Sequence, residues 1–90
     1  MIATTKLMLT AKQGNASAQY NLANIHYYGK GVLQDNIRAH IWYNIASSNS
    51  YKEAGKWRDE TAAKMTSADI SEAKKMAQEC MNTNYQNCDW

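Results

Sequence analysis

Apolar residues recur along the chain at helical spacing in five segments, which short polar or glycine-containing stretches separate. In the second segment, for example, Ala18, Leu22 and Ile25 fall on one face of a helix. This pattern predicts helices over residues 2–12, 16–28, 36–47, 51–65 and 67–81. Residues 82–90 are rich in Asn and lack helical periodicity, so we predict a non-helical tail there.

Residues at the segment boundaries favour the same helix ends. Asn15, Asp35 and Thr66 each precede an apolar segment, and short polar side chains of this kind accept hydrogen bonds from the first free backbone N–H groups of a helix. Gly14 and Gly29 follow the first and second segments, where a left-handed backbone that ends a helix is easiest for Gly. The boundaries therefore support a chain of consecutive helices.

Composition narrows the fold class further. Leu, Ile and Val number only eleven, Phe and Pro are absent, and thirteen Ala, nine aromatic and five Met residues carry the apolar character. Such a chain suits helices better than a sheet, and 90 residues suffice for one domain. The net charge of +2 does not indicate a nucleic-acid partner, and no apolar run is long enough for membrane insertion.

A denser pattern of small residues and glycines occupies residues 11–49. It reads Gly14-Asn15-Ala16-x-Ala18-Gln19-x-x-Leu22-Ala23, then Gly29-x-Gly31-Val32-x-x-Asp35, then Ala39-x-x-Trp42 and Ala46. This stretch resembles one repeat of the Sel1-like family, a relative of the tetratricopeptide repeats. Two positions depart from the family pattern, since Ala23 stands where Gly is usual and His26 where Tyr is usual.

The resemblance implies an all-α fold, a short right-handed α-solenoid of antiparallel helix pairs in a single domain, 1–90. In that arrangement 1–13 is a helix of a truncated preceding repeat and 14–49 is a complete repeat. The segment 50–81 resembles a degenerate capping helix pair, and 82–90 is the tail. Small residues at the helix crossings allow close approach, so such a stack needs few large aliphatic residues.

The resemblance also implies a protein–protein interaction module that presents a concave helical groove to a peptide or protein partner. By analogy with tetratricopeptide geometry, the groove would be lined by Ser17, Tyr20, Asn24, Tyr27, Lys56, Glu60 and Lys64. The alternative for the tyrosines is that they pack against the adjoining helix. Two other functions stay open: a structural C-terminal cap of a longer repeat protein, or a beta-lactamase-type hydrolase, as proposed for cysteine-rich relatives.

Candidate catalytic chemistry is sparse. His26 and His40 lie on different predicted helices without an acid at ligand spacing, so packing roles are favoured over a metal site. Asp59 and Glu60 are adjacent and point to different faces, and Asp59 is better explained as an ion-pair partner of Arg58. We therefore expect no enzyme activity, no metal site and no cofactor.

The two cysteines, Cys80 and Cys88, lie at the end of the last predicted helix and in the tail. One hypothesis is a disulfide that fixes the tail; the other is a buried Cys80 with a free Cys88. Family members often act outside the cytoplasm, where disulfides persist. A periplasmic or secreted location is expected if the chain belongs to a longer exported protein, and a cytoplasmic one otherwise.

The first predicted helix has its own apolar residues. Ile2, Leu7 and Leu9 would be exposed at the end of the stack, on a face that normally meets a neighbouring repeat. We therefore predict a homodimer formed through this helix.

Overall fold

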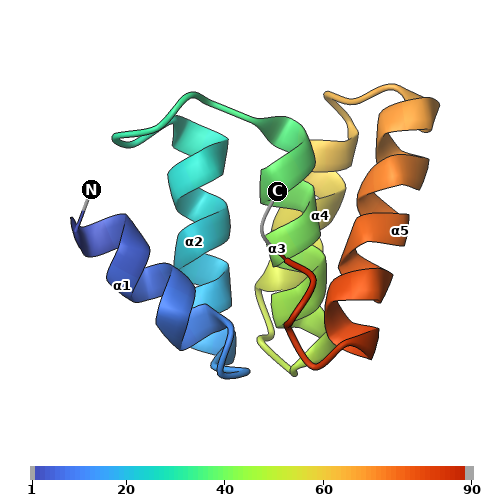
Figure 1. Cartoon of the computed structure of the whole chain (residues 1–90). Helices are drawn as coiled ribbons and strands as arrows, with labels where there is room; N and C mark the ends of the chain where they lie inside the picture. Colours follow the sequence, from blue (N-terminus) through green and yellow to red (C-terminus); the bar gives the residue numbers. More distant parts are fainter. Residues whose placement is uncertain (1, 89–90) are drawn as a thin grey trace.

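The computed structural model describes the backbone of residues 2–88 and the side chains of residues 5–88. Within this part of the chain all regular structure is helical (Figure 1). The helices are α1 (Ile2–Ala11), α2 (Ala16–Tyr28), α3 (Asn36–Ser48), α4 (Ala54–Ala62) and α5 (Ser67–Asn82). They form a short all-α solenoid, so the predicted fold class is confirmed. In the described chain, no helix has the length and apolar character needed to cross a bilayer.

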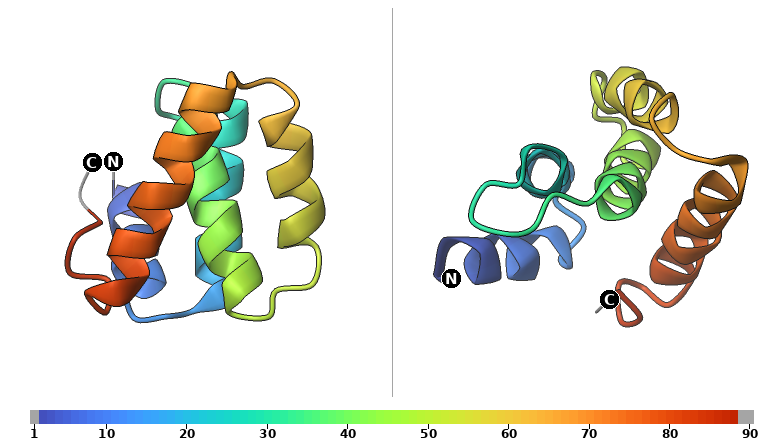
Figure 2. Two further views of the ribbon diagram at one scale, coloured as in Figure 1. Left: turned by 90° about the vertical axis from the view of Figure 1, so that its right-hand side faces the viewer. Right: turned by 90° about the horizontal axis from the view of Figure 1, so that it is seen from above.

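Helix α3 is the centre of the stack. Helices α2, α4 and α5 all pack against α3, while α1 packs against α2. Figure 2 shows α4 and α5 on different sides of α3, and Figure 1 shows α1 running obliquely across the lower part of α2. The segment expected as a capping pair therefore consists of two helices that each pack on α3 far more than on one another.

The helix ends form where the sequence predicts them because the capping contacts are local. Asn15 Oδ1 accepts a hydrogen bond from the Ala18 N–H at 2.8 Å, and Asp35 Oδ1 accepts one from the Arg38 N–H at 3.1 Å. Gly29 ends α2 with φ of 69° in the left-handed region. These caps confirm the predicted limits of α2 and the start of α3.

Helix α4 is shorter than the predicted helix 51–65. Ser50 adopts a left-handed φ of 71°, and the Tyr51 N–H returns to the Ala46 carbonyl at 3.0 Å, so the chain is still turning there. Glu53, which precedes α4, makes no capping hydrogen bond with its side chain. At the other end the Met65 N–H bonds to the carbonyl three residues earlier, a tight turn rather than an α-helical one.

The core combines small residues at helix crossings with a few large ones. Its large, fully buried apolar side chains are Leu22, Ile41, Trp42, Tyr43 and Ile45. Around them lie buried alanines on α1, α2, α3 and α5, namely Ala11, Ala18, Ala23, Ala39, Ala73 and Ala77. This arrangement explains how so few aliphatic residues suffice, because close helix approach leaves little volume to fill.

The tail folds back on the end of α5 instead of extending away from it. Cys80 and Cys88 are bonded as a disulfide with their Cα atoms 5.0 Å apart, and both are fully buried. Between them, Asn84 and Tyr85 have left-handed φ values of 54° and 66°, and the Tyr85 N–H bonds to the Cys80 carbonyl at 2.8 Å. The tail thereby reaches the ends of α1 and α3 (Figures 1 and 2).

Helix α1 presents less apolar surface than the sequence predicts. Leu7 is half-buried and packs against the core, so it is less exposed than expected, because α1 packs on α2. Leu9 is 60% exposed, and the Ile2 side chain lies outside the described residues. Self-association through α1 stays a prediction.

Candidate functional site

The structure gathers three of the predicted groove residues on one side of α2. Tyr20, Asn24 and Tyr27 are all half-buried there and interact with residues of α3 or α4, or with the loop before α4. Ser17 is exposed one turn earlier on α2. Lys56 is exposed on α4, with its Nζ 5.9 Å from the centre of the neighbouring Trp57 ring.

Five aromatic side chains form a continuous cluster on this side, which we call the aromatic ladder: Tyr20, Tyr27, Tyr43, Tyr51 and Trp57. Tyr20 stacks on Tyr51 with ring centres 4.4 Å apart and touches Tyr43 at 5.7 Å. Tyr27 meets Tyr43 at 6.2 Å and Trp57 at 6.0 Å, edge to face. These separations are typical of favourable aromatic pairs. The predicted packing of the tyrosines against adjoining helices is therefore present.

Tyr43 is the buried member of the ladder and contacts both Tyr20 and Tyr27. This ring is fully buried, and its hydroxyl donates a hydrogen bond to Asn24 Oδ1 at 2.5 Å. Burial raises the pKa of Tyr43, so the phenol stays protonated and keeps donating. Asn24 therefore holds Tyr43, and its side-chain oxygen is already engaged within the protein.

Cationic and exposed groups border the ladder. Lys64 Nζ donates a hydrogen bond to the Tyr27 hydroxyl at 2.8 Å and lies 4.7 Å from the ring centre. This hydrogen bond raises the pKa of Lys64 and thus favours its charged form. Tyr28 is 57% exposed and meets Tyr27 edge to face at 4.9 Å. Glu60 is exposed on α4 and makes a favourable electrostatic contribution to Lys64.

Sequence reasoning missed Tyr43, Tyr51 and Trp57 as members of this surface. Tyr20 and Tyr27 are seven residues apart and share a helix face, which is visible in the sequence. The other three rings come from α3, α4 and the loop between them. These rings come together only because of how the helices pack against one another, and the spacing of residues along the sequence does not predict that packing.

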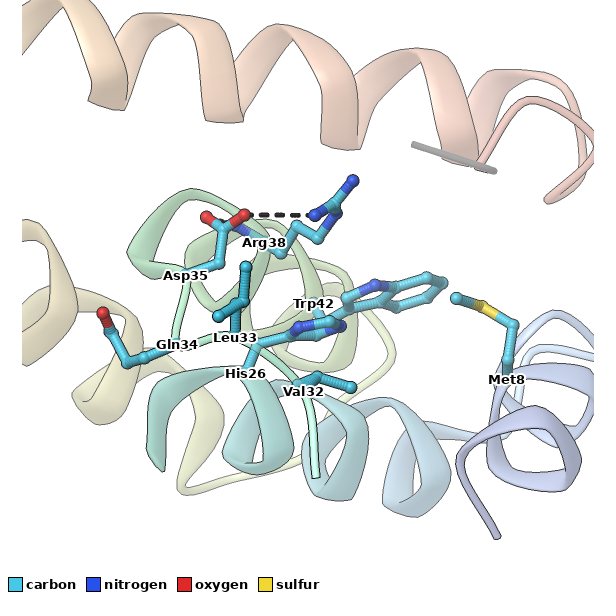
Figure 3. A pocket seen from close by; sticks show the side chains of 8 residues that line it. All are labelled: Met8, His26, Val32, Leu33, Gln34, Asp35, Arg38 and Trp42. Atoms are coloured by element: carbon cyan, nitrogen blue, oxygen red, sulfur yellow. Dashed lines mark hydrogen bonds and ion pairs between the residues drawn. The ribbon is translucent and has the colours of Figure 1, made fainter. Parts of the chain in front are cut away.

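A hollow lies away from the ladder, between α1, the loop after α2, and α3 (Figure 3). It has a volume of about 480 Å³ and is lined by Met8, His26, Val32, Leu33, Gln34, Asp35, Arg38 and Trp42. Leu33 on its rim is 91% exposed, and Asp35 and Arg38 form an ion pair at 3.2 Å. His26 is only 8% exposed, and burial, followed by the charge of Arg38, lowers its pKa.

The remaining chemical candidates lie apart. His40 lines another hollow, between α3, α4 and α5, and does not share a pocket with His26. The Asp59 carboxylate accepts a hydrogen bond from Arg58 Nε at 3.1 Å, as predicted for an ion pair. Among the described residues, no group of three or more His, Cys, Asp or Glu side chains is arranged to hold a metal ion.

Comparison with known families agrees with this architecture. Residues 16–51 match the family model of the Sel1 repeat, which covers α2, α3 and the loop up to Tyr51 of the ladder. Comparison with curated proteins gave no match, and comparison with solved structures gave none either. Sel1 repeats generally mediate protein–protein interaction and are generally non-enzymatic. Residues 16–51, which include the second and third helices, are therefore similar to a Sel1 repeat.

Proposed function

We propose that the protein is an interaction module that binds a peptide or protein partner on the aromatic ladder. The observation that carries this proposal is a set of four half-exposed rings, Tyr20, Tyr27, Tyr51 and Trp57, all held in place by contacts within the fold. Packing on the adjoining helices and binding a partner are compatible, because each of these four residues is only partly buried.

Aromatic rings held in this way suit recognition for an energetic reason. Tyr and Trp offer large contact areas, and such residues often dominate the binding energy of protein interfaces. A ring that is already ordered in the free protein loses little conformational entropy when a partner covers it. The buried Tyr43 and its bond to Asn24 supply this order for Tyr20 and Tyr27.

The charges around the ladder indicate the chemistry of the partner. Lys56 and Lys64 lie beside Trp57 and Tyr27 and leave their ammonium groups at the surface. A segment with apolar or aromatic residues at its centre and acidic residues at its flanks would complement both features. We expect salt to weaken the binding of such a segment, because the lysines are exposed.

Selection from a displayed peptide library, with the purified protein as target, tests the proposal. We expect enriched peptides of the composition described above, and at least about 30-fold weaker binding to Tyr27→Ala, as for an interface hot spot. Lys64→Gln removes an exposed charge together with its hydrogen bond to the Tyr27 hydroxyl, and it should weaken binding of the acidic peptides and reduce the salt dependence of that binding. Leu33→Ala, on the hollow away from the ladder, is the matched control and should bind normally.

Two results would overturn the ladder as the binding surface. One is enriched peptides that bind Tyr27→Ala, Lys64→Gln and the parent protein equally well. The other is loss of binding in Leu33→Ala alone. Failure to enrich any peptide would favour the alternative, a structural cap of a longer repeat protein. Circular dichroism of each variant separates lost binding from lost folding.

A further inference from the structure

Helices α4 and α5 diverge as they pack on α3, and the space between them is a pocket of about 500 Å³. Figure 2 shows the two helices on either side of α3. The pocket is lined by His40 and Asn44 of α3, Arg58, Asp59 and Ala62 of α4, and Ile70 and Lys74 of α5. A plain capping pair would close this space with apolar residues, whereas most of these side chains are polar or charged.

His40 is the most deeply buried polar residue of the pocket. It is 1% exposed, and its Nδ1 has no hydrogen-bond partner among the described residues. Burial lowers its pKa, and the positive charges of Arg58 and Lys74 lower it further, while Asp59 acts weakly in the opposite direction. Buried polar atoms of this kind usually have a partner. Nδ1 of His26, in the hollow lined by Met8 and Leu33, is also unpartnered among the described residues, so the charges around His40 distinguish this pocket.

The charges of the pocket favour an anion. Arg58 donates from Nε to Asp59 Oδ1 at 3.1 Å and from Nη1 to Asn44 Oδ1 at 3.2 Å, which fixes the guanidinium plane. These bonds use two of the five N–H donors that a guanidinium carries. Asp59 is balanced by Arg58, so the ammonium of Lys74 leaves the pocket with a surplus positive charge.

The apolar residues of the pocket walls indicate the size and polarity of the ligand. Ala62 and Ile70 contribute apolar surface from α4 and α5. An anion with a short aliphatic stem therefore fits better than a compact inorganic ion, because the stem buries apolar area against these walls. The side chain of glutamate has this form.

We propose that this pocket binds a glutamate side chain of the partner protein, with its carboxylate held by Arg58 and Lys74 and its stem against Ala62 and Ile70. The inference rests on the proposed function, since it assumes a protein partner. It adds a second contact point on the other side of α4 from Lys56 and Trp57, and it assigns a role to charged residues that the ladder does not use.

Nuclear magnetic resonance of the two histidines tests the pocket without any knowledge of the partner. Butyrate reproduces the stem and carboxylate of glutamate, and butyramide is its neutral counterpart. An anion beside Arg58 and Lys74 offsets the charges that lower the His40 pKa. We therefore expect butyrate to raise the His40 pKa in a saturable manner, butyramide to leave it unchanged, and His26 to serve as an internal control that does not respond.

Variants make the assignment specific. Lys74→Gln removes an exposed charge and should weaken butyrate binding about tenfold, while Lys75→Gln, on the same helix but outside the pocket lining, should not. An unchanged His40 pKa up to saturating butyrate, or an equal response of His40 and His26, would overturn the proposal. Because no peptide is used, a negative result here leaves the ladder untouched, and a failed peptide selection leaves this pocket untouched.

Discussion

Asn49 at the end of α3 and Tyr85 in the tail are joined by a hydrogen bond of 2.9 Å from Asn49 Nδ2 to the Tyr85 hydroxyl, across 36 residues of sequence. The same amide nitrogen donates to Gln19 Oε1 at 2.9 Å, and Gln19 Nε2 donates to the Ala11 carbonyl at 2.9 Å. Gln19 is fully buried, so this network holds the ends of α1, α2 and α3 and the tail together inside the protein.

We predict that Tyr85→Phe lowers the free energy of unfolding by about 1 kcal/mol, the usual contribution of one internal hydrogen bond. Urea denaturation measures this loss. Tyr28→Phe is the matched control, because the Tyr28 ring is 57% exposed, and its effect should stay within about 0.5 kcal/mol. Equal effects of the two substitutions would show that the Asn49 contact adds nothing to stability.

The disulfide between Cys80 and Cys88 encloses the segment that carries Tyr85. We predict that Cys80→Ala/Cys88→Ala, or reduction, lowers the free energy of unfolding by roughly 2.5 kcal/mol, the loop-closure value for a separation of 8 residues. Thiol titration of the unfolded, unreduced protein should find no free thiol. Two thiols would mean that the bridge does not form.

The disulfide and the tyrosine contact should also depend on each other. In a double-mutant cycle, Tyr85→Phe should cost less in the Cys80→Ala/Cys88→Ala background than in the parent, because a released tail no longer holds its hydroxyl on Asn49. Additive effects would indicate that Tyr85 stays in place without the bridge.

The two histidines predict a pH dependence of stability with a definite sign. Burial lowers the pKa of both His26 and His40 in the folded state. Below the unfolded-state pKa of about 6.5, the histidines bind protons in the unfolded chain but stay neutral in the folded protein. The free energy of unfolding therefore falls as the pH falls. We expect full stability above pH 7 and a loss of up to about 1.4 kcal/mol per pH unit for each histidine as the pH approaches the folded-state values.

Denaturation in urea at intervals between pH 7.5 and 5.5 checks this expectation, since carboxyl groups titrate mostly below that range. His26→Gln should remove about half of the slope, whatever its effect on stability at pH 7.5. A slope that is unchanged in His26→Gln would assign the whole pH dependence to His40 or to other groups.

Two glycines give opposite predictions for substitution by alanine. Gly29 has φ of +69°, and an added Cβ would lie 3.1 Å from Gln34 Cβ, so Gly29→Ala should destabilise the protein by about 1 kcal/mol or more. Gly55 lies in α4, and its added Cβ would meet Ser47 Oγ at 3.4 Å. Gly55→Ala should therefore be neutral or stabilise by up to about 1 kcal/mol. Thermal unfolding of both variants measures the difference.

The sequence was sufficient for the features that depend on neighbouring residues. Asn15, Asp35 and Thr66 cap the helices that they were expected to cap, and each does so through a backbone N–H three residues away. Gly29 adopts the left-handed backbone expected of it. These contacts form within one helical turn, so they do not depend on how the helices pack against one another.

The limits of α4 were less predictable. The sequence from Tyr51 to Met65 has helical periodicity, yet the helix spans only Ala54–Ala62. Its first turn competes with a tight turn around Ser50, and no side chain caps it. Periodicity indicates which residues can face a core. The ends of a helix depend instead on which backbone N–H and C=O groups form hydrogen bonds outside the helix.

What the sequence determined by itself, then, was the helical repeat, its caps and the tyrosine pair on α2. What only the tertiary structure decided was the aromatic ladder, the bonds of Asn49 to Gln19 and Tyr85, and the charged pocket at His40. These features join residues from different helices, and their geometry depends on how α3 packs against its neighbours. Residues 30 or 36 positions apart in the sequence can lie at any distance in space, and the packing of the helices determines whether they meet.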